Sequence, residues 1–298
     1  MFFALMLLAC PPSTVPGDEI PLSAAMLDYE DNPRRKLWLF TEDQGLFSRQ
    51  EPHVAKDISS LGAVVYNEEL ILTGICWWPG CGSEAEMEKR QRLGPLVFGI
   101  ATTDLTEWRP LQWRLWDPQG FTPIDPQLRL ENNSLSLWYF GATGQAHRDP
   151  ADRSVHSIRR APIQDDGRFH VQETVLSYPG LADPSPITFR GQEWLFATQF
   201  AGEKIVGFHN NAQEPTLEFK GVSVPFALEV REELWLLGTR MVQGVQQPVR
   251  AISTDGQTFS AFSPFLPVPN GKPCASPVGA VLKDQVVVFC VEEPTRPG

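Results

Sequence analysis

Helix-type periodicity is scarce in this sequence of 298 residues. Segments in which apolar residues recur every three to four positions are hard to find, which argues against a helical fold. Basic residues are in the minority, with 25 Lys and Arg against 36 Asp and Glu. The formal net charge of −11 argues against nucleic acid or an anionic lipid surface as the main partner. The apolar run at residues 1–10 is too short to span a bilayer.

Turns and strands are abundant instead. Residues 121–141 read as two strands joined by the turn Glu131-Asn132-Asn133-Ser134, in which Asn tolerates the left-handed backbone of hairpin turns. The second strand is rich in aromatic residues, as β-structure prefers. Related hairpins begin at four other positions: Ser60, Ser185, Val224 and Ser276. Five β-type copies at intervals of roughly 40 to 65 residues point to a propeller or another repeat array.

A second half-repeat follows each complete hairpin: a third strand, a polar turn and a fourth strand that opens on an aromatic residue. Four strands form one blade of a β-propeller. The last hairpin lacks this half, and residues 37–47 match the equivalent residues 249–259. We therefore predict an all-β, five-bladed β-propeller whose last blade is closed by the amino-terminal strands. A β-sandwich with coincidental turn spacing is the alternative, and it would not explain the complementary halves. The predicted blades cover about residues 57–115, 120–173, 181–220, 221–265, and 274–292 joined with 36–50.

The hairpins also carry a family resemblance. Ile124-Asp125-Pro126 and the turn Ser253-Thr254-Asp255-Gly256 resemble motifs of the arabinanase/xylosidase-type five-bladed glycoside hydrolases. The resemblance implies a site at which three carboxylates converge from the first three blades. One is a base, one orients its neighbours and tunes their pKa, and a Glu acts as the acid. An inverting hydrolase needs its acid and base far enough apart to admit a water molecule.

Carried over to this chain, the resemblance puts Asp125 at the second-blade carboxylate position. Ser60 stands where the first-blade base is expected, so that base is missing unless Asp57 reaches in. The third-blade Glu has no counterpart, and Asp183 is the nearest carboxylate. The catalytic candidates are therefore Asp125, Asp183 and Asp57. The alternative for an Asp-Pro pair such as Asp183-Pro184 is a structural Asp that caps the strand turn.

Aromatic residues and histidines supply the ligand-binding candidates. Trp77 and Trp78 lie in an insertion, where exposed rings suit stacking on sugars. His147 and His209 could reach the rim of the propeller or bind an ion; the alternative for each is a solvated loop histidine. Neither cysteine pair of the repeats has a His within a few residues, as compact zinc sites require, and we expect no metal and no cofactor.

The amino terminus carries an export signature. Leu7-Leu8-Ala9-Cys10 resembles the lipobox of bacterial lipoprotein signal peptides, in which the Cys becomes lipidated. A plain secretory signal is the alternative. The Pro-rich residues 11–21 suit an extended tether. We therefore assign residues 1–20 to a signal peptide and tether, and residues 21–298 to the propeller.

Four cysteines remain, and an even number in an exported protein suggests disulfides. We expect Cys76 and Cys81 to close a small loop at the end of a blade strand. Cys274 and Cys290 flank the last hairpin. A symmetric register places Pro277 opposite Cys290, which argues against their pairing.

These features predict a lipid-anchored propeller of the bacterial cell envelope that binds a glycan at the mouth of the channel. The incomplete carboxylate set leaves hydrolysis open. The alternative is a non-catalytic scaffold for protein interactions. We expect a monomer with a carbohydrate or other small polar ligand, no nucleic-acid partner, and membrane contact through the lipid anchor only. Carboxyl groups of Asp125 and Asp183 about 6–10 Å apart across an open cleft would favour an inverting glycosidase.

Overall fold

The computed structural model describes residues 35–76, 97–111, 113, 122–142, 155–165, 167–168, 173–200, 203–267 and 274–292. Every regular element in these ranges is a β-strand, as predicted. Within the same ranges, no helix has the length and apolar character needed to cross a membrane.

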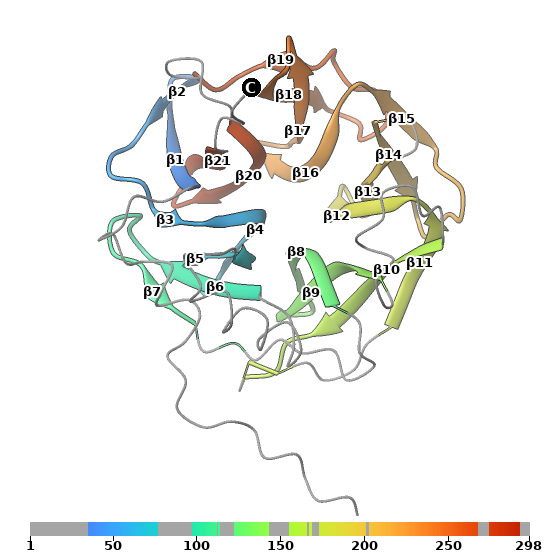
Figure 1. Cartoon of the computed structure of the whole chain (residues 1–298), viewed down its shortest axis with the longest axis horizontal. Coiled ribbons are helices and arrows are strands. Elements are labelled where there is room, and N and C mark those ends of the chain that lie inside the picture. The colour runs from blue at the N-terminus through green and yellow to red at the C-terminus, as the bar shows by residue number, and fades with distance from the viewer. Residues whose placement is uncertain are drawn as a thin grey trace, which may run out of the picture.

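The strands form five antiparallel sheets arranged in a ring, with the first strand of each predicted hairpin nearest the centre (Figure 1). The first blade contains β4 (Ile58–Tyr66), β5 (Glu69–Cys76), β6 (Val97–Thr102) and β7 (Arg109–Pro110). The second contains β8 (Thr122–Glu131), β9 (Ser134–Ala142), β10 (Val155–Pro162) and β11 (Glu173–Pro179). The third contains β12 (Leu181–Phe189), β13 (Gln192–Gln199), β14 (Lys204–His209) and β15 (Leu217–Lys220). The fourth contains β16 (Ser223–Val230), β17 (Glu233–Val242), β18 (Val245–Ser253) and β19 (Ser263–Pro264). The five-bladed propeller is confirmed.

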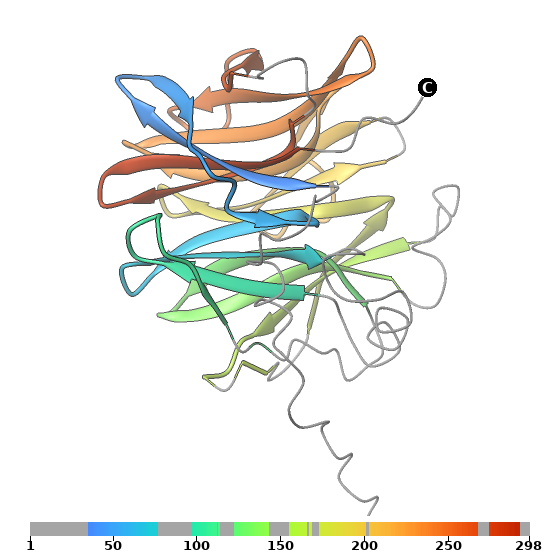
Figure 2. The ribbon, with the colours of Figure 1, turned by 60° about the vertical axis from the view of Figure 1, so that its left-hand side comes forward.

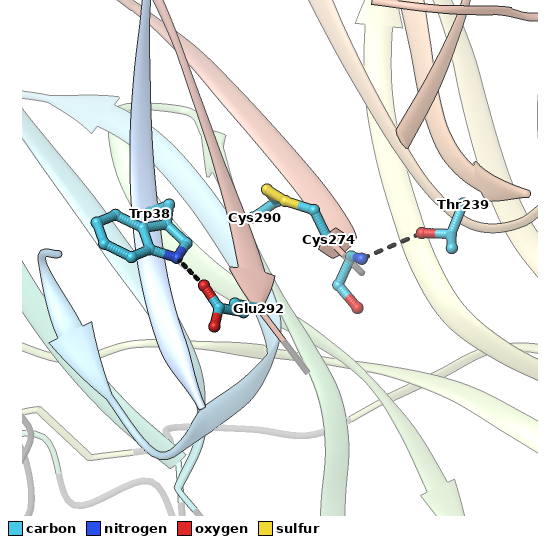
Figure 3. Close-up of a disulfide and its surroundings, with 6 residues drawn as sticks. Trp38, Thr239, Cys274, Cys290 and Glu292 are labelled. Atoms are coloured by element: carbon cyan, nitrogen blue, oxygen red, sulfur yellow. Dashed lines mark hydrogen bonds between the residues drawn. A yellow bond between two sulfur atoms is a disulfide. The ribbon is translucent and has the colours of Figure 1, made fainter. Parts of the chain in front are cut away.

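The fifth blade joins the two halves of the chain, as predicted. It contains β20 (Cys274–Leu282), β21 (Gln285–Glu292), β1 (Lys36–Asp43) and β2 (Leu46–Arg49), and β3 (Ala55–Lys56) also pairs with β1. The indole N–H of Trp38 on β1 donates a hydrogen bond of 2.8 Å to Glu292 on β21 (Figure 3). Pairing β1 with β21 leaves neither strand as an open sheet edge.

The register argument against pairing Cys274 with Cys290 does not hold. A disulfide joins them, with their Cα atoms 5.7 Å apart (Figure 3). Cys274 lies opposite Glu292, and Cys290 lies two residues before Glu292, so the cysteines are diagonal neighbours on one side of the sheet. The pairing register shifts between Ala275 and Val278. Such a bulge bends its strand, and the resulting Cα separation is typical of a disulfide.

The same irregularity occurs in the first strand of every blade. Each strand skips two residues in its pairing with the second strand: 60–61, 125–126, 183–184, 224–225 and 276–277. In the third blade we expected Ser185 at this position, and the structure shows that Asp183 occupies it. The strand begins earlier than its hydrophobic pattern indicated, because Leu181 and Ala182 already pair with Gln199 and Thr198.

The blades pack through apolar faces and close backbone contacts. Figure 2 shows the strands of all blades spanning the thickness of the ring. One close contact lies at Gly62, where an added Cβ would stand 2.6 Å from the Pro126 carbonyl oxygen of the next blade. Gln127 Nε2 donates a buried hydrogen bond of 2.5 Å to the Leu61 carbonyl across the same boundary. These contacts fix the first two blades against each other, and with them the residues at the start of their inner strands.

Candidate functional site

Five residues with positive φ lie at equivalent places near the start of the inner strands. We call them the bulge residues, and they are Ser60 (φ 53°), Asp125 (53°), Asp183 (49°), Val224 (53°) and Ser276 (52°). Each is partly buried and begins the skipped pair of its blade. A positive φ is uncommon for a residue other than Gly, and least favourable for a β-branched one such as Val224. Strained backbone of this kind collects at functional sites. We call the face of the ring that carries them the mouth face.

Side chains of the first three blades meet at Asp125. The Ser60 hydroxyl donates a hydrogen bond of 2.7 Å to Asp125 Oδ1. The backbone N–H of Asp183 also donates to the Asp125 carboxylate. The side chains of Asp125 and Asp183 are also within hydrogen-bonding distance of each other. The two predicted catalytic residues are therefore in contact.

Threonines continue this pattern around the ring. Thr198 on β13 hydrogen-bonds to the carboxylate of Asp183, and it accepts a bond of 2.8 Å from the N–H of Val224 in the next blade. Thr239 on β17 accepts a bond of 3.1 Å from the N–H of Ser276. Each bulge interrupts the ladder within its own blade, and at Asp183, Val224 and Ser276 a backbone N–H donates to a side chain of the preceding blade. The bulge residues thus connect the blades at the mouth face.

Burial and mutual repulsion change the acidity of the carboxyl pair. Burial, followed by the negative charge of Asp125, holds the pKa of Asp183 well above its ordinary value. Burial also raises the pKa of Asp125, although hydrogen bonds from Ser60 and Asp183 oppose this shift. Two adjacent carboxyl groups in such a place cannot readily both ionise, because like charges at contact repel strongly. The arrangement favours one shared proton, carried by Asp183 and directed at Asp125.

This geometry does not match a hydrolytic acid–base pair. Oxygens joined by an O–H···O bond lie about 2.5–3.0 Å apart. An inverting pair of carboxyl groups needs a gap of about 6.5–9.5 Å for its water, and a retaining pair about 5–5.5 Å. Asp125 and Asp183 leave no such gap. Ser60, which stands in the position of the expected base, is instead a hydrogen-bond donor to Asp125.

Asp57 has different partners. Its backbone N–H donates to the Arg35 carbonyl at 3.0 Å, and its Oδ1 accepts from the Arg35 N–H at 3.2 Å. The side chain is buried, with 2% of the residue exposed. These bonds hold the chain entering β1 against the chain entering β4. The described hydrogen bonds therefore join Asp125 to Asp183, whereas those of Asp57 go to the backbone of Arg35.

The ligand-binding candidates are only partly placed. His209 ends β14 and stacks on Trp194 with ring centroids 4.4 Å apart. Trp194 pairs with Ile187, four residues beyond the bulge at Asp183, so His209 lies toward the face opposite the mouth. Five other predicted residues fall outside the described residues: Cys10, Trp77, Trp78, Cys81 and His147. Cys76 is disulfide-bonded, and its pairing with Cys81 stays a prediction. Among the described residues, no group of three His, Cys, Asp or Glu side chains could hold a metal ion.

Two features of the site escaped the sequence analysis. Thr198 had no motif to mark it, since only the tertiary contact with Asp183 and Val224 gives it a role. The equivalence of Asp183 with Asp125 was visible in principle, because both precede a Pro. Ser185, at which we predicted the third-blade hairpin to begin, is buried and accepts a 2.8 Å hydrogen bond from the N–H of Ala227.

Comparisons with known proteins bear on the fold. No protein-family model matches the sequence, and no curated protein matches it either. A thermostable family-43 glycoside hydrolase has a similar structure, with a TM-score of 0.60 and 10% identity over 81% of this chain and 86% of that one. An endo-arabinase from Bacteroides thetaiotaomicron has a TM-score of 0.57 and 13% identity over 81% of this chain and 91% of its own. An alpha-L-arabinofuranosidase from Clostridium thermocellum has a TM-score of 0.53 and 15% identity over 76% and 80%.

These similarities establish the architecture that the hairpin motifs implied. The chain has the five-bladed propeller fold found in family-43 glycoside hydrolases of the arabinanase/xylosidase type. A shared fold does not carry an activity with it, because one fold hosts many functions. The function therefore has to be argued from the residues at the mouth face.

Proposed function

We propose that this protein is a lipid-anchored propeller of the bacterial cell envelope that binds a glycan at the mouth face without hydrolysing it. One observation carries the proposal: Asp125 and Asp183 share a direct hydrogen bond instead of flanking a water-sized gap. The propeller has a glycosidase-like fold, but its two central carboxyl groups share a proton and are not separated as an acid and a base. This polar centre still suits sugar hydroxyls. Hydroxyls both donate and accept hydrogen bonds, as this pair does.

Two further points support the assignment of ligand and location. The structurally similar proteins are named for action on glycans, namely arabinan and arabinofuranosides. The Cys274–Cys290 disulfide suits an oxidising compartment outside the cytoplasm. The lipid anchor rests on Cys10 alone, which lies outside the described residues.

The test uses the full chain carrying Cys10→Ser, which removes the predicted lipidation thiol. It is compared with the same chain carrying Asp125→Asn, and with Asp284→Asn as a control at an exposed turn. Each is screened for binding on a glycan array and for product release from aryl-glycosides and polysaccharides. We expect binding without turnover. Asp125→Asn should weaken binding by roughly tenfold, since hydrogen bonds to a charged acceptor are stronger than those to a neutral one.

The outcomes separate the two parts of the proposal. Turnover that disappears in Asp125→Asn would show an enzyme and overturn the non-hydrolytic assignment. If Asp125→Asn and Asp284→Asn change the binding affinity equally, the glycan does not bind at the mouth face. Absence of binding to any glycan would reject carbohydrate as the ligand.

One observation favours the second candidate, a scaffold for protein interactions. Phe200 follows β13 and is 52% exposed, and Met241 near the end of β17 is 59% exposed. Both lie toward the mouth face, because Gln199 pairs with Leu181 and Thr239 pairs with Ser223 near the starts of the inner strands. Contiguous exposed apolar patches are typical of protein-binding surfaces. Cross-linking to an envelope protein that is lost in Phe200→Ser but retained in Asp125→Asn would establish this function instead.

A further inference from the structure

A second candidate site lies on the face opposite the mouth, between the second and third blades. There a cavity of about 590 Å³ opens among the far ends of β8, β9, β10 and β13. This volume falls within the range of about 300–1,000 Å³ that small-molecule sites occupy. Arg129 lies four residues beyond Asp125 along β8, a separation of about 13 Å along an extended strand. The cavity is therefore distinct from the carboxyl pair at the mouth face.

Charged side chains dominate the cavity wall, and they are paired with one another. Arg129 forms an ion pair with Glu193 and lies 3.7 Å from Glu131. Arg160 forms an ion pair with Glu173 and lies 3.3 Å from Glu131. Glu131 thus links the two guanidinium groups. The wall holds three carboxylates and two guanidinium groups, so an added anion would compete with carboxylates already in place.

The carboxylate of Glu193 remains ionised in this network. Burial alone would raise the pKa of Glu193, but hydrogen bonds from Arg129 and Thr188 outweigh burial and lower the pKa. The Thr188 hydroxyl donates at 2.8 Å to Glu193 Oε1. Carboxylate, guanidinium and hydroxyl groups are therefore presented together on one wall, as strong acceptors and donors.

Trp138 on β9 lies at the back of this network with an unused donor. Its ring lies 5.7 Å from the guanidinium carbon of Arg129 and 5.7 Å from that of Arg160. The residue lines the cavity and is only 5% exposed. Its indole Nε1 has no hydrogen-bond partner within the described part of the chain. A buried N–H without an acceptor is unfavourable.

We propose that this cavity binds a neutral, polyhydroxylated molecule of the size of a mono- or disaccharide. Internally paired charges disfavour an ionic ligand, and the polar wall disfavours an apolar one. Sugar hydroxyls match both the carboxylates and the guanidinium groups of the cavity wall. The site does not depend on the glycan site proposed at the mouth face.

The test observes the indole N–H of Trp138 directly. Two-dimensional ¹H–¹⁵N NMR spectra are recorded on the full chain carrying Cys10→Ser, and the Trp138 indole signal is assigned by its loss in Trp138→Phe. Lactose, maltose and xylobiose are titrated as neutral probes, with inorganic phosphate and glucosamine as charged ones. We expect a neutral probe to shift this signal to saturation.

Two variants locate the binding. Ala212→Trp fills the cavity from the loop after β14 and should abolish the shift while the melting temperature is unchanged. Asp125→Asn alters only the mouth face and should leave the titration as in the parent chain. A signal that no neutral sugar shifts, or a shift that persists in Ala212→Trp, would overturn the proposal. Saturation by phosphate or glucosamine alone would overturn the neutral class of ligand. If no glycan binds at the mouth face, the sugar titrations of this cavity are still interpretable.

Discussion

Replacing Asp183 with Asn tests the proton-sharing pair. Asn keeps the size of the side chain and can still donate from its amide to Asp125. It cannot ionise. The variant therefore preserves the neutral form that the folded protein favours and removes the charged form that burial and Asp125 disfavour. We expect Asp183→Asn to be more stable than the parent chain at neutral pH.

The sign of the effect follows from proton binding. The pKa of Asp183 is raised in the folded state, so between the ordinary pKa of about 4 and the raised value the folded protein holds a proton that the unfolded chain has lost. The stabilising effect of this group is complete below the unfolded pKa and is lost as pH rises through the folded pKa. Within this window one group costs the parent chain up to about 1.4 kcal/mol of unfolding free energy per pH unit. For a domain of this size that is roughly 3 °C of melting temperature per pH unit.

The assay is urea denaturation of the parent chain and of Asp183→Asn at half-unit steps from pH 4 to 8. The difference in unfolding free energy should be small at pH 4 and grow as the pH rises. Asp284→Asn serves as a matched control at an exposed turn, and its difference from the parent should stay constant. A constant difference for Asp183→Asn as well would refute the shared proton and the contact geometry inferred from it.

Three further predictions concern the fold. Replacing Cys274 and Cys290 together by Ser opens a link with a sequence separation of 16 residues, and it should lower the unfolding free energy in urea by about 3 kcal/mol. Gly62→Ala should cost about 1–3 kcal/mol in the same assay, because its Cβ would meet the Pro126 carbonyl oxygen at 2.6 Å and rigid backbone cannot move aside. Asp104 accepts backbone N–H bonds within its turn, which lower its pKa to about 2, so its carboxyl ¹³C resonance should not titrate above about pH 3.

Repetition along the chain makes this fold predictable from its sequence. Each blade repeats the same order of turn residues and alternating strands, and hairpin turns are local, so Asn132-Asn133 or Lys283-Asp284 predicts its turn from adjacent residues alone. The half-repeat at residues 37–47 identified the partner of β21 although they lie far apart in the chain. Local sequence patterns did not predict where the bulges lie. Asp183 and Ser185 lie two residues apart and each precedes a Pro, so the local sequence of β12 did not distinguish Asp183 from Ser185 as the bulge residue.

The architecture, the closure of the fifth blade and the interest of Asp125 and Asp183 could all be predicted from the order of residues alone. These follow from local propensity and from a repeated pattern, both of which are written along the chain. Three findings required the folded molecule: the two carboxyl groups touch, Ser60 and Thr198 hold them, and Cys274 pairs with Cys290. Contacts between blades depend on the bend at each bulge and on how closely neighbouring strands approach. Those quantities are set by packing across the whole ring, and no single stretch of sequence records them.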